Sequence, residues 1–552
     1  MPSSTQLSDR QITGTGCSKQ IFWSLCIAVL LLSSVLLFAR LGHYALWDDE
    51  TGDALSAESV LQTGDTKAFV GHNIIGYDHG GLLAKLRCEA DPPFVAYTAA
   101  LSMRIFGINT FAARLPFALF GLACVGLMFR WMWKWKASTV TVAVFSVVLI
   151  TNVSFFLYSR QCHYYGAAML FSMVVAYIYT NWRGDILRGG IMGICLALLM
   201  STNPCFFISI CMCLLVDYLI WQRKINPVRW LDLAVVLLPS LVMGLIMLQW
   251  WNPFHCELAK WLGHNSHFQQ LILFLWYCRD VNQCEMLMVL LVPFAIVASF
   301  VNHITPLKRG LVAILVDIVA MTLLSNQIVN VTNCADIRFL SNLIPLFIAV
   351  EVFTLCWLVT ASFERAWVSI PVAILAFGSN LFYGAGLITP EDIRSSLYCF
   401  ARELWNPPSD PYSETSKWIR KNVQKGESVW VQPAYATGPL MFHAPDPLYA
   451  WQLLPPPQGQ FAKLALIHFA GILPPDYMVA FGPNLAEVKD AIQKMNDADK
   501  DFYYRREAVI NYFWRDLYRP ELFWRRFESV RNFNPEIEAI YVFKRVPKTP
   551  LQ

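Results

Sequence analysis

An α-helical polytopic membrane protein with a C-terminal soluble α/β domain is the fold class that this sequence predicts, on three observations. First, 56% of the 552 residues are hydrophobic and only 15% are charged, against roughly a quarter charged in ordinary soluble domains. Second, apolar runs of membrane-spanning length recur along the first two thirds of the chain. Third, charged residues and consecutive prolines replace this pattern after Asp392. Together these features indicate about eleven transmembrane helices followed by a domain outside the bilayer.

The charge balance gives no sign of a nucleic-acid partner. The chain has 43 Lys+Arg and 39 Asp+Glu, a net charge of +4, and it contains no basic run or recognition motif. Membrane lipids are the partners that this composition predicts.

The N-terminal region is predicted to be a short cytoplasmic tail followed by an uncleaved first span. Residues 1–19 are polar, and the apolar run from Ile21 to Phe38 is long enough to cross a bilayer. A charged segment follows this run in place of a small-residue cleavage site, which is unlike a signal peptide. The long loop at 40–110 then contains two patterned segments, a helical one at Thr51–Gln62 and a short amphipathic one at Pro92–Phe106.

Residues 20–390 are predicted to form the transmembrane domain. Basic residues are concentrated in alternate short connections, so the positive-inside rule places the N-terminus in the cytoplasm. The first loop and the C-terminus then lie outside. After the first span, the expected spans are 112–130, 138–157, 164–181, 187–202, 205–221, 231–250, 286–301, 309–324, 338–358 and 366–384.

Residues 391–552 are expected to form an outward-facing α/β domain. Ser413–Asn422 has the pattern of an amphipathic helix with Ser413 as its N-cap, and Leu485–Met495 that of a second helix. Strands are predicted at Ser428–Val431 and Ile540–Phe543. No Gly-rich phosphate loop occurs in this region, so no nucleotide cofactor is expected.

Four polar features gather on one side of the membrane in this topology. They are Asp48-Asp49-Glu50, the segment from Tyr158 to Tyr165, the loop with His255, His264 and His267, and Asp336-Ile337-Arg338-Phe339. A carboxylate can act as a general base, and arginines can hold a phosphate by paired hydrogen bonds. Simpler interpretations stay open: Arg160 and Arg338 lie at span ends, where side chains snorkel to the interface, and His264 and His267 suit a polar loop.

An ordered series of short motifs resembles the C-type (GT-C) membrane glycosyltransferases, above all the bacterial aminoarabinose transferase and protein O-mannosyltransferase group. The likeness covers about residues 20–390. The motifs are Asp49-Glu50, Gly64-Asp65, Asp91-Pro92-Pro93-Phe94, Phe106-Gly107-Ile108-Asn109, Ala113-Arg114-Leu115-Pro116, Ser159-Arg160 with Tyr165, Asn203-Pro204, and Arg338-Phe339 with Pro345.

The resemblance implies roles for particular residues. Asp49 resembles the catalytic aspartate and Glu50 its acidic companion, while Arg160, Arg338 and Tyr165 resemble residues around the donor phosphate. Glu89 or Asp91 resembles an acid that binds a divalent metal in some relatives, and His255, His264 or His267 would supply a second ligand. The chain departs from many relatives at Asp91, where they have Lys or His before the double proline.

The resemblance also implies a reaction. A sugar would move from a polyprenyl-phosphate-linked donor to an outward-facing lipid, glycan or protein acceptor, with inversion and with the loop aspartate as general base. Because the leaving phosphate is anchored in the bilayer, such an enzyme needs no nucleotide site.

A membrane transporter or lipid flippase is the alternative function. Asp317 and Glu351 lie inside predicted spans, where ionisable residues are often functional, and their depths would let the two acids meet. No inverted repeat or matched pair of broken helices supports this alternative.

Overall fold

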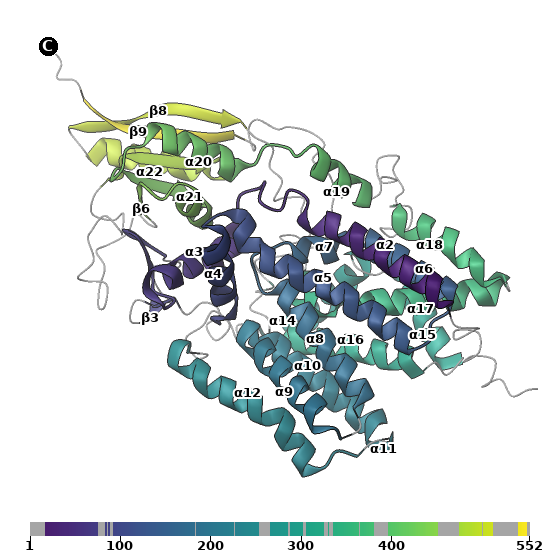
Figure 1. Ribbon diagram of the computed structural model, residues 1–552. Helices are drawn as coiled ribbons and strands as arrows, with labels where there is room; N and C mark the ends of the chain where they lie inside the picture. Colours follow the sequence, from purple (N-terminus) through teal and green to yellow (C-terminus); the bar gives the residue numbers. More distant parts are fainter. Residues whose placement is uncertain are drawn as a thin grey trace, which may run out of the picture.

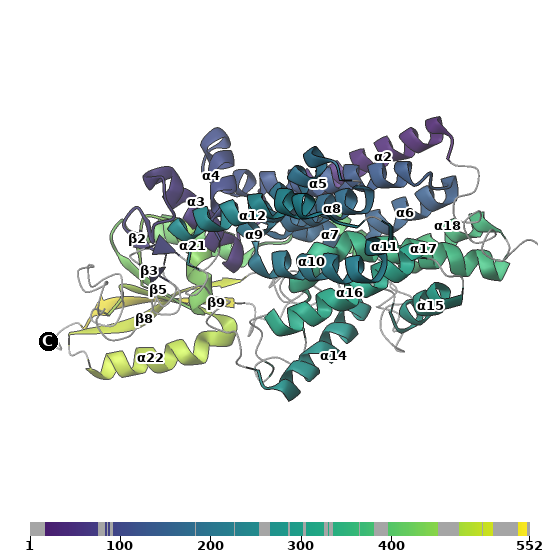
Figure 2. The same cartoon turned by 90° about the horizontal axis from the view of Figure 1, so that it is seen from below.

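The computed structural model contains a bundle of long helices with an α/β domain packed at one end (Figures 1 and 2). The structure describes residues 17–75, 83–84, 87–88, 92–182, 184–225, 227–252, 265–284, 288–301, 305–324, 329, 335–363, 365–379, 396–450, 474–498, 501–511 and 539–548. The predicted boundary at 390/391 and most of the predicted tail at 1–19 lie outside the described residues, so the domain limits stay a prediction.

Most of the bundle helices coincide with predicted apolar spans, as far as the structure describes them. Among the described residues, five helices are long and apolar enough to cross a membrane, or six if one bent pair is a single span; the predicted count of about eleven stays a prediction. The bundle elements are α2 (Lys19–Phe38), α5 (Thr110–Lys134), α6 (Thr139–Thr151), α7 (Val153–Ser159), α8 (Tyr165–Asn181), α9 (Ile186–Thr202), α10 (Pro204–Asp217), the π-helical η2 (Tyr218–Gln222), α11 (Arg223–Ile225), α12 (Trp230–Trp250), α14 (His267–Cys284), α15 (Met288–Val301), α16 (Thr305–Leu324), the 3-10 helix η3 (Ile337–Leu343), α17 (Ile344–Phe363), η4 (Ala366–Val368) and α18 (Ser369–Gly378).

Two departures from the predicted spans have local causes. The run at 138–157 is broken into α6 and α7, which are bent by 58°. Asn152 lies at the break, and its side chain accepts a hydrogen bond from the Phe155 N–H, which starts α7 as a new helix. Helix α14 was not predicted as a span, because Arg279, Asp280 and Asn282 interrupt its apolar pattern.

The first loop contains the helix on which the predicted acids lie. Helix α3 (Asp48–Thr63) begins three residues before the predicted segment, because Asp48, Asp49 and Glu50 form its first turn, where the helix dipole favours carboxylates. It ends at Gly64, whose φ of +79° is the left-handed conformation that glycine adopts readily. The rest of the loop has two small hairpins, β1 (Phe69–Val70) with β2 (Asn73–Ile74) and β3 (Leu83–Ala84) with β4 (Arg87–Cys88), and then α4 (Phe94–Phe106).

The C-terminal domain is built on a five-stranded mixed sheet of order β6-β5-β7-β9-β8. Strand β5 pairs in parallel with β6 and β7, while β9 runs antiparallel to β7 and β8. The predicted α/β class and all four predicted elements are confirmed. The elements are α19 (Ser396–Trp405), α20 (Pro411–Asn422), β5 (Ser428–Gln432), η5 (Ala434–Ala436), α21 (Thr437–His443), β6 (Leu448–Ala450), β7 (Tyr477–Phe481), η8 (Gly482–Asn484), α22 (Leu485–Ala498), β8 (Phe502–Asn511) and β9 (Ala539–Pro547).

The predicted N-cap of α20 was wrong. Asp410, not Ser413, caps the helix, since its Oδ1 accepts a hydrogen bond from the Tyr412 N–H. Pro411 occupies the first helical position, where its missing N–H costs nothing. Ser413 lies inside the first turn and donates its hydroxyl to Asp410 at 2.8 Å.

Candidate active site

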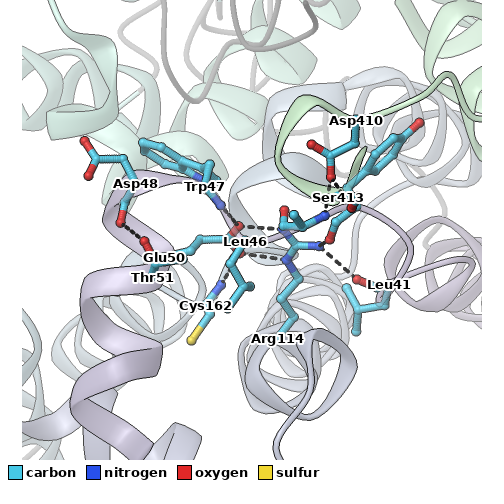
Figure 3. A network of polar contacts seen from close by, with 12 residues as sticks. Leu41, Leu46, Trp47, Asp48, Glu50, Thr51, Arg114, Cys162, Asp410 and Ser413 are labelled. Carbon is cyan, nitrogen blue, oxygen red and sulfur yellow. Dashed lines mark hydrogen bonds and ion pairs between the residues drawn. The ribbon is translucent and has the colours of Figure 1, made fainter. Parts of the chain in front are cut away.

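Glu50, in the first turn of α3, and Arg114 of α5 form a buried ion pair (Figure 3). Arg114 Nε and Nη2 donate to Glu50 Oε1 and Oε2 at 2.7 and 2.5 Å. The Glu50 carboxylate, with a side-chain exposure of 0%, also accepts from the backbone N–H groups of Cys162 and Trp47. The other N–H groups of Arg114 bind the carbonyls of Leu41, Tyr44 and Ala45, so all five of its donors are used. This pair holds the chain between α2 and α3 in one conformation.

The C-terminal domain also binds the segment between α2 and α3. Asp410 Oδ2 accepts a hydrogen bond from the Ala45 N–H, and His443 Nε2 lies 3.2 Å from the Leu46 N. Burial lowers the pKa of His443 to about 4, so its imidazole is neutral near pH 7 and can accept that hydrogen bond. A Cβ at Gly438 of α21 would lie 2.6 Å from Thr51 Oγ1, so α21 packs directly on α3.

Arg338 joins Asp49 to the start of α17. Its Nη1 donates to Asp49 Oδ2 at 2.6 Å, and its Nε and Nη2 donate to Asp336, the N-cap of η3. The Arg338 guanidinium also lies 5.6 Å from the centre of the Trp47 ring, within cation–π range. The side chains of Asp49 and Arg338 are 33% and 20% exposed, whereas Glu50 is fully buried. Of the two neighbouring acids, Asp49 is therefore the one that a substrate can reach.

Tyr165 lies beside this pair in an aromatic group at the start of α8. Its phenol lies near Arg338, Asp49 and Asp336, and its ring centre is 4.9 Å from that of His163. His163 Nδ1 lies 2.5 Å from Oδ2 of Asp53. Asp53 follows Asp49 by one turn of α3. Burial raises the pKa of Asp53, although the His163 contact opposes this shift.

Arg160 binds the end of α2. Its Nη1 donates to the Leu36 and Leu37 carbonyls at 2.7 and 2.9 Å, and its Nη2 donates to the Ala39 carbonyl at 2.9 Å. These carbonyls have no partner within their own helix, so Arg160 caps a helix C-terminus. With an exposure of 9%, it does not snorkel to an interface.

The candidate metal ligands are mostly outside the part of the chain that the structure describes. Glu89, Asp91, His255 and His264 all lie in those gaps. His267 is the first residue of α14; it is exposed, and its Nδ1 lies 3.4 Å from Gln270 Oε1. Within the described ranges, no three His, Cys, Asp or Glu side chains gather closely enough to hold a metal ion.

The acids of the alternative function are both buried in the bundle. Asp317 Oδ1 accepts hydrogen bonds from Ser209 Oγ and from Asn342 Nδ2, the latter at 3.4 Å. Glu351 is 1% exposed. Since Asn342 lies one turn after Arg338 in η3, the Asp317 contacts support the element that carries Arg338.

Sequence reasoning assigned no role to four side chains at this site. Arg114 is buried inside an apolar helix, and an ionisable residue in such a position is by itself a signal of a functional or structural partner. Arg114 was named only as part of a family motif, and Asp336 only as part of the polar feature around Arg338. Asp410 and His443 gave no signal, because they lie 365 and 397 residues from the backbone groups that they bind.

Comparison with known proteins identifies the fold. No protein-family model matches the sequence, and a comparison with curated proteins finds no match. Solved structures do match, and the protein is a membrane protein with the fold of the C-type glycosyltransferases. The resemblance drawn from the motifs is thereby confirmed at the level of the fold.

One of the matching structures is that of ArnT, an aminoarabinose transferase, from Cupriavidus metallidurans. Its structure bound to undecaprenyl phosphate has a TM-score of 0.51 and 13% identity, with 95% of this chain and 98% of that chain covered. The apo state has a TM-score of 0.53 and 13% identity, with 94% and 97% covered. The Archaeoglobus fulgidus oligosaccharyltransferase in complex with Zn and sulfate has a TM-score of 0.45 and 11% identity, with 83% of this chain and 68% of that chain covered.

Proposed function

We propose that the protein is an integral membrane glycosyltransferase that moves a sugar from a polyprenyl-phosphate-linked donor to a lipid, glycan or protein acceptor. The transfer is inverting, with Asp49 as general base. The site and the C-terminal domain face outward, as the distribution of basic residues in the short loops predicts. The fold shared with ArnT, whose structure holds undecaprenyl phosphate, supports a donor of this class.

The observation that carries this proposal is the contact between Asp49 and Arg338 at 2.6 Å, which joins a partly exposed carboxylate to an arginine, a side chain suited to holding phosphate. The described contacts use three of the five Arg338 N–H groups. Within the part of the chain that the structure describes, two N–H groups of Arg338 are then left for a donor phosphate.

The chemistry follows from these positions. Asp49 takes the proton of the acceptor hydroxyl as that oxygen bonds to the anomeric carbon. The bond from this carbon to the phosphate oxygen breaks on the opposite face, and the phosphate keeps the electron pair. Arg338 stabilises the charge that develops on the phosphate. Glu50 and Arg114 do not contact the substrate in this mechanism, because their hydrogen-bonding groups already bind each other and the backbone.

A panel of synthetic polyprenyl-phosphate sugars tests the function. Purified protein is mixed with each donor and with membranes that supply acceptors, and release of free polyprenyl phosphate is measured, since it is common to every acceptor. Release above that of boiled protein supports transfer, and the anomeric configuration of the product tests inversion. A flippase that used Asp317 and Glu351 would move labelled lipid between leaflets without consuming any donor.

Replacing each candidate phosphate-binding arginine with lysine distinguishes their roles. Arg338→Lys keeps the charge but loses the planar fork, so we expect transfer to fall at least tenfold, with a higher KM for donor. Arg160→Lys should raise the donor KM only if Arg160 also touches phosphate. An unchanged KM with a lower melting temperature would leave Arg160 as the cap of α2. Wild-type transfer by Arg338→Lys would remove Arg338 from phosphate binding.

A divalent metal at Glu89 or Asp91 with His264 or His267 remains a proposal that rests on the resemblance. Carboxylate and imidazole together suit zinc or manganese, and a cation there would help to hold the donor phosphate. We expect chelator treatment to lower transfer and added metal to restore it. Undiminished turnover after metal removal would leave Arg338 and Arg160 as the cationic contacts.

A further inference from the structure

A cavity of about 700 Å³ lies at the end of the bundle remote from Asp49. It is bounded by the start of α2, the C-terminal ends of α5 and α8, and the start of α9. Helix α2 has 20 residues, so about 30 Å separates this cavity from the first loop. The cations Arg130, Lys134, Lys136 and Arg188 line it, together with the rings of Trp133 and Tyr177.

The charge of the cavity is of one sign. No Asp or Glu is among its lining residues in the described part of the chain. Lys134 Nζ lies 5.6 Å from the centre of the Tyr177 ring, and Arg188 has a long contact of 3.5 Å with Asp185 outside the lining. The positive-inside rule accounts for basic residues at this end of the bundle. That rule does not explain why these basic residues surround a single cavity lined by aromatic rings.

Lys136 adds an independent indication. Its φ is +54°, the left-handed conformation that glycine or asparagine usually supplies at a helix end. The Lys136 and Ala137 N–H groups donate to the Trp133 and Met132 carbonyls, so Lys136 occupies the position after the C-cap of α5. Lysine carries a steric cost here that glycine avoids. Strain of this kind is retained where the side chain has a use.

We propose that this cavity binds the phosphate-bearing headgroup of an anionic phospholipid. Its cations would hold the phosphate. Ile191 also lines it and is 40% exposed, which gives the cavity an apolar side where acyl chains can follow. A soluble phosphate compound would use the cations but would gain nothing from the apolar wall. The inference is independent of the proposed transfer reaction, since it concerns the other end of the bundle.

Lipid retention measured by native mass spectrometry tests this site. The detergent-purified full chain is titrated with phosphatidylglycerol, with phosphatidylcholine of the same acyl chains, and with inorganic phosphate. We expect preferential retention of phosphatidylglycerol, weakened about fivefold in Lys136→Gly and in Arg130→Gln. Lys224→Gln is the matched control, because Lys224 on α11 is an exposed cation at the same end but outside the cavity.

The glycine variant separates binding from folding. Lys136→Gly relieves the left-handed strain, so its melting temperature should equal or exceed that of the wild type even as lipid retention falls. Equal retention of the two lipids, or equal losses in Lys224→Gln and the cavity variants, would overturn the proposal. Binding of inorganic phosphate that phosphatidylglycerol fails to displace would also overturn it and would indicate a soluble phosphate ligand.

Discussion

Asp49→Asn is expected to abolish sugar transfer while the protein still inserts in the membrane and folds. The amide keeps the size of the side chain and can still accept a hydrogen bond from Arg338, but it cannot take a proton from an acceptor hydroxyl. Loss of a general base typically lowers the rate by 10² to 10⁴, and we expect a loss of about this size. The measurement is release of polyprenyl phosphate from an active donor.

Asp48→Asn is the matched control for this prediction. Asp48 is adjacent in sequence and lies in the same first turn of α3, whereas the carboxylate that accepts from Arg338 Nη1 at 2.6 Å is that of Asp49. Its variant should keep most of the activity. Full activity in Asp49→Asn would remove Asp49 from the mechanism, and loss only in Asp48→Asn would move the base by one residue.

Breaking the Glu50–Arg114 pair should cause the largest loss of stability. Removal of one partner from a buried ion pair costs about 3–5 kcal/mol, because the other charge stays buried without compensation. We expect Glu50→Gln and Arg114→Met each to lower the melting temperature strongly and to reduce transfer with it. Arg104→Gln, an exposed cation on α4, is the control and should change neither.

The double variant shows whether the two side chains act as a unit. Glu50→Gln with Arg114→Met should cost clearly less than the sum of the single variants, since no charge is then left unpaired. Additive losses would mean that the carbonyls of Leu41, Tyr44 and Ala45, rather than Glu50, are the important partners of Arg114. Normal stability with lost transfer in Glu50→Gln would instead place Glu50 in direct contact with substrate.

Hydrophobic patterning was sufficient to predict the fold class, because the bilayer imposes a length and a composition on each spanning helix. The gathering of Asp49, Tyr165 and Arg338 was also predictable, since alternating spans place their connections on the same side. Patterning could not show the break at Asn152, because apolar residues continue on both sides of it. Nor could patterning assign different roles to Asp48, Asp49 and Glu50. These three acids are adjacent, and their burial differs only because they contact different residues far away in the sequence.

The remaining part of the site depends on contacts across most of the chain. A basic residue near a span end has the same sequence signal whether it caps a helix, as Arg160 does for α2, or binds an acid, as Arg338 does. The attachment of the C-terminal domain through Asp410 and His443 has no local pattern at all. Such contacts follow from the packing of whole elements, which periodicity does not encode.

The attachment of Asp410 and His443 to the segment before α3 also sets an order of events during biosynthesis. Helix α3 and the residues before it, Ala45 and Leu46, leave the ribosome early. Their partners Asp410 and His443 lie 365 and 397 residues later in the chain. At about 5–20 residues per second, this interval is roughly 20–80 s. During that time the acidic helix of the first loop is present without the domain that fixes it. A ribosome that stops before residue 410 would therefore release a product that is inserted in the membrane but has an incomplete site.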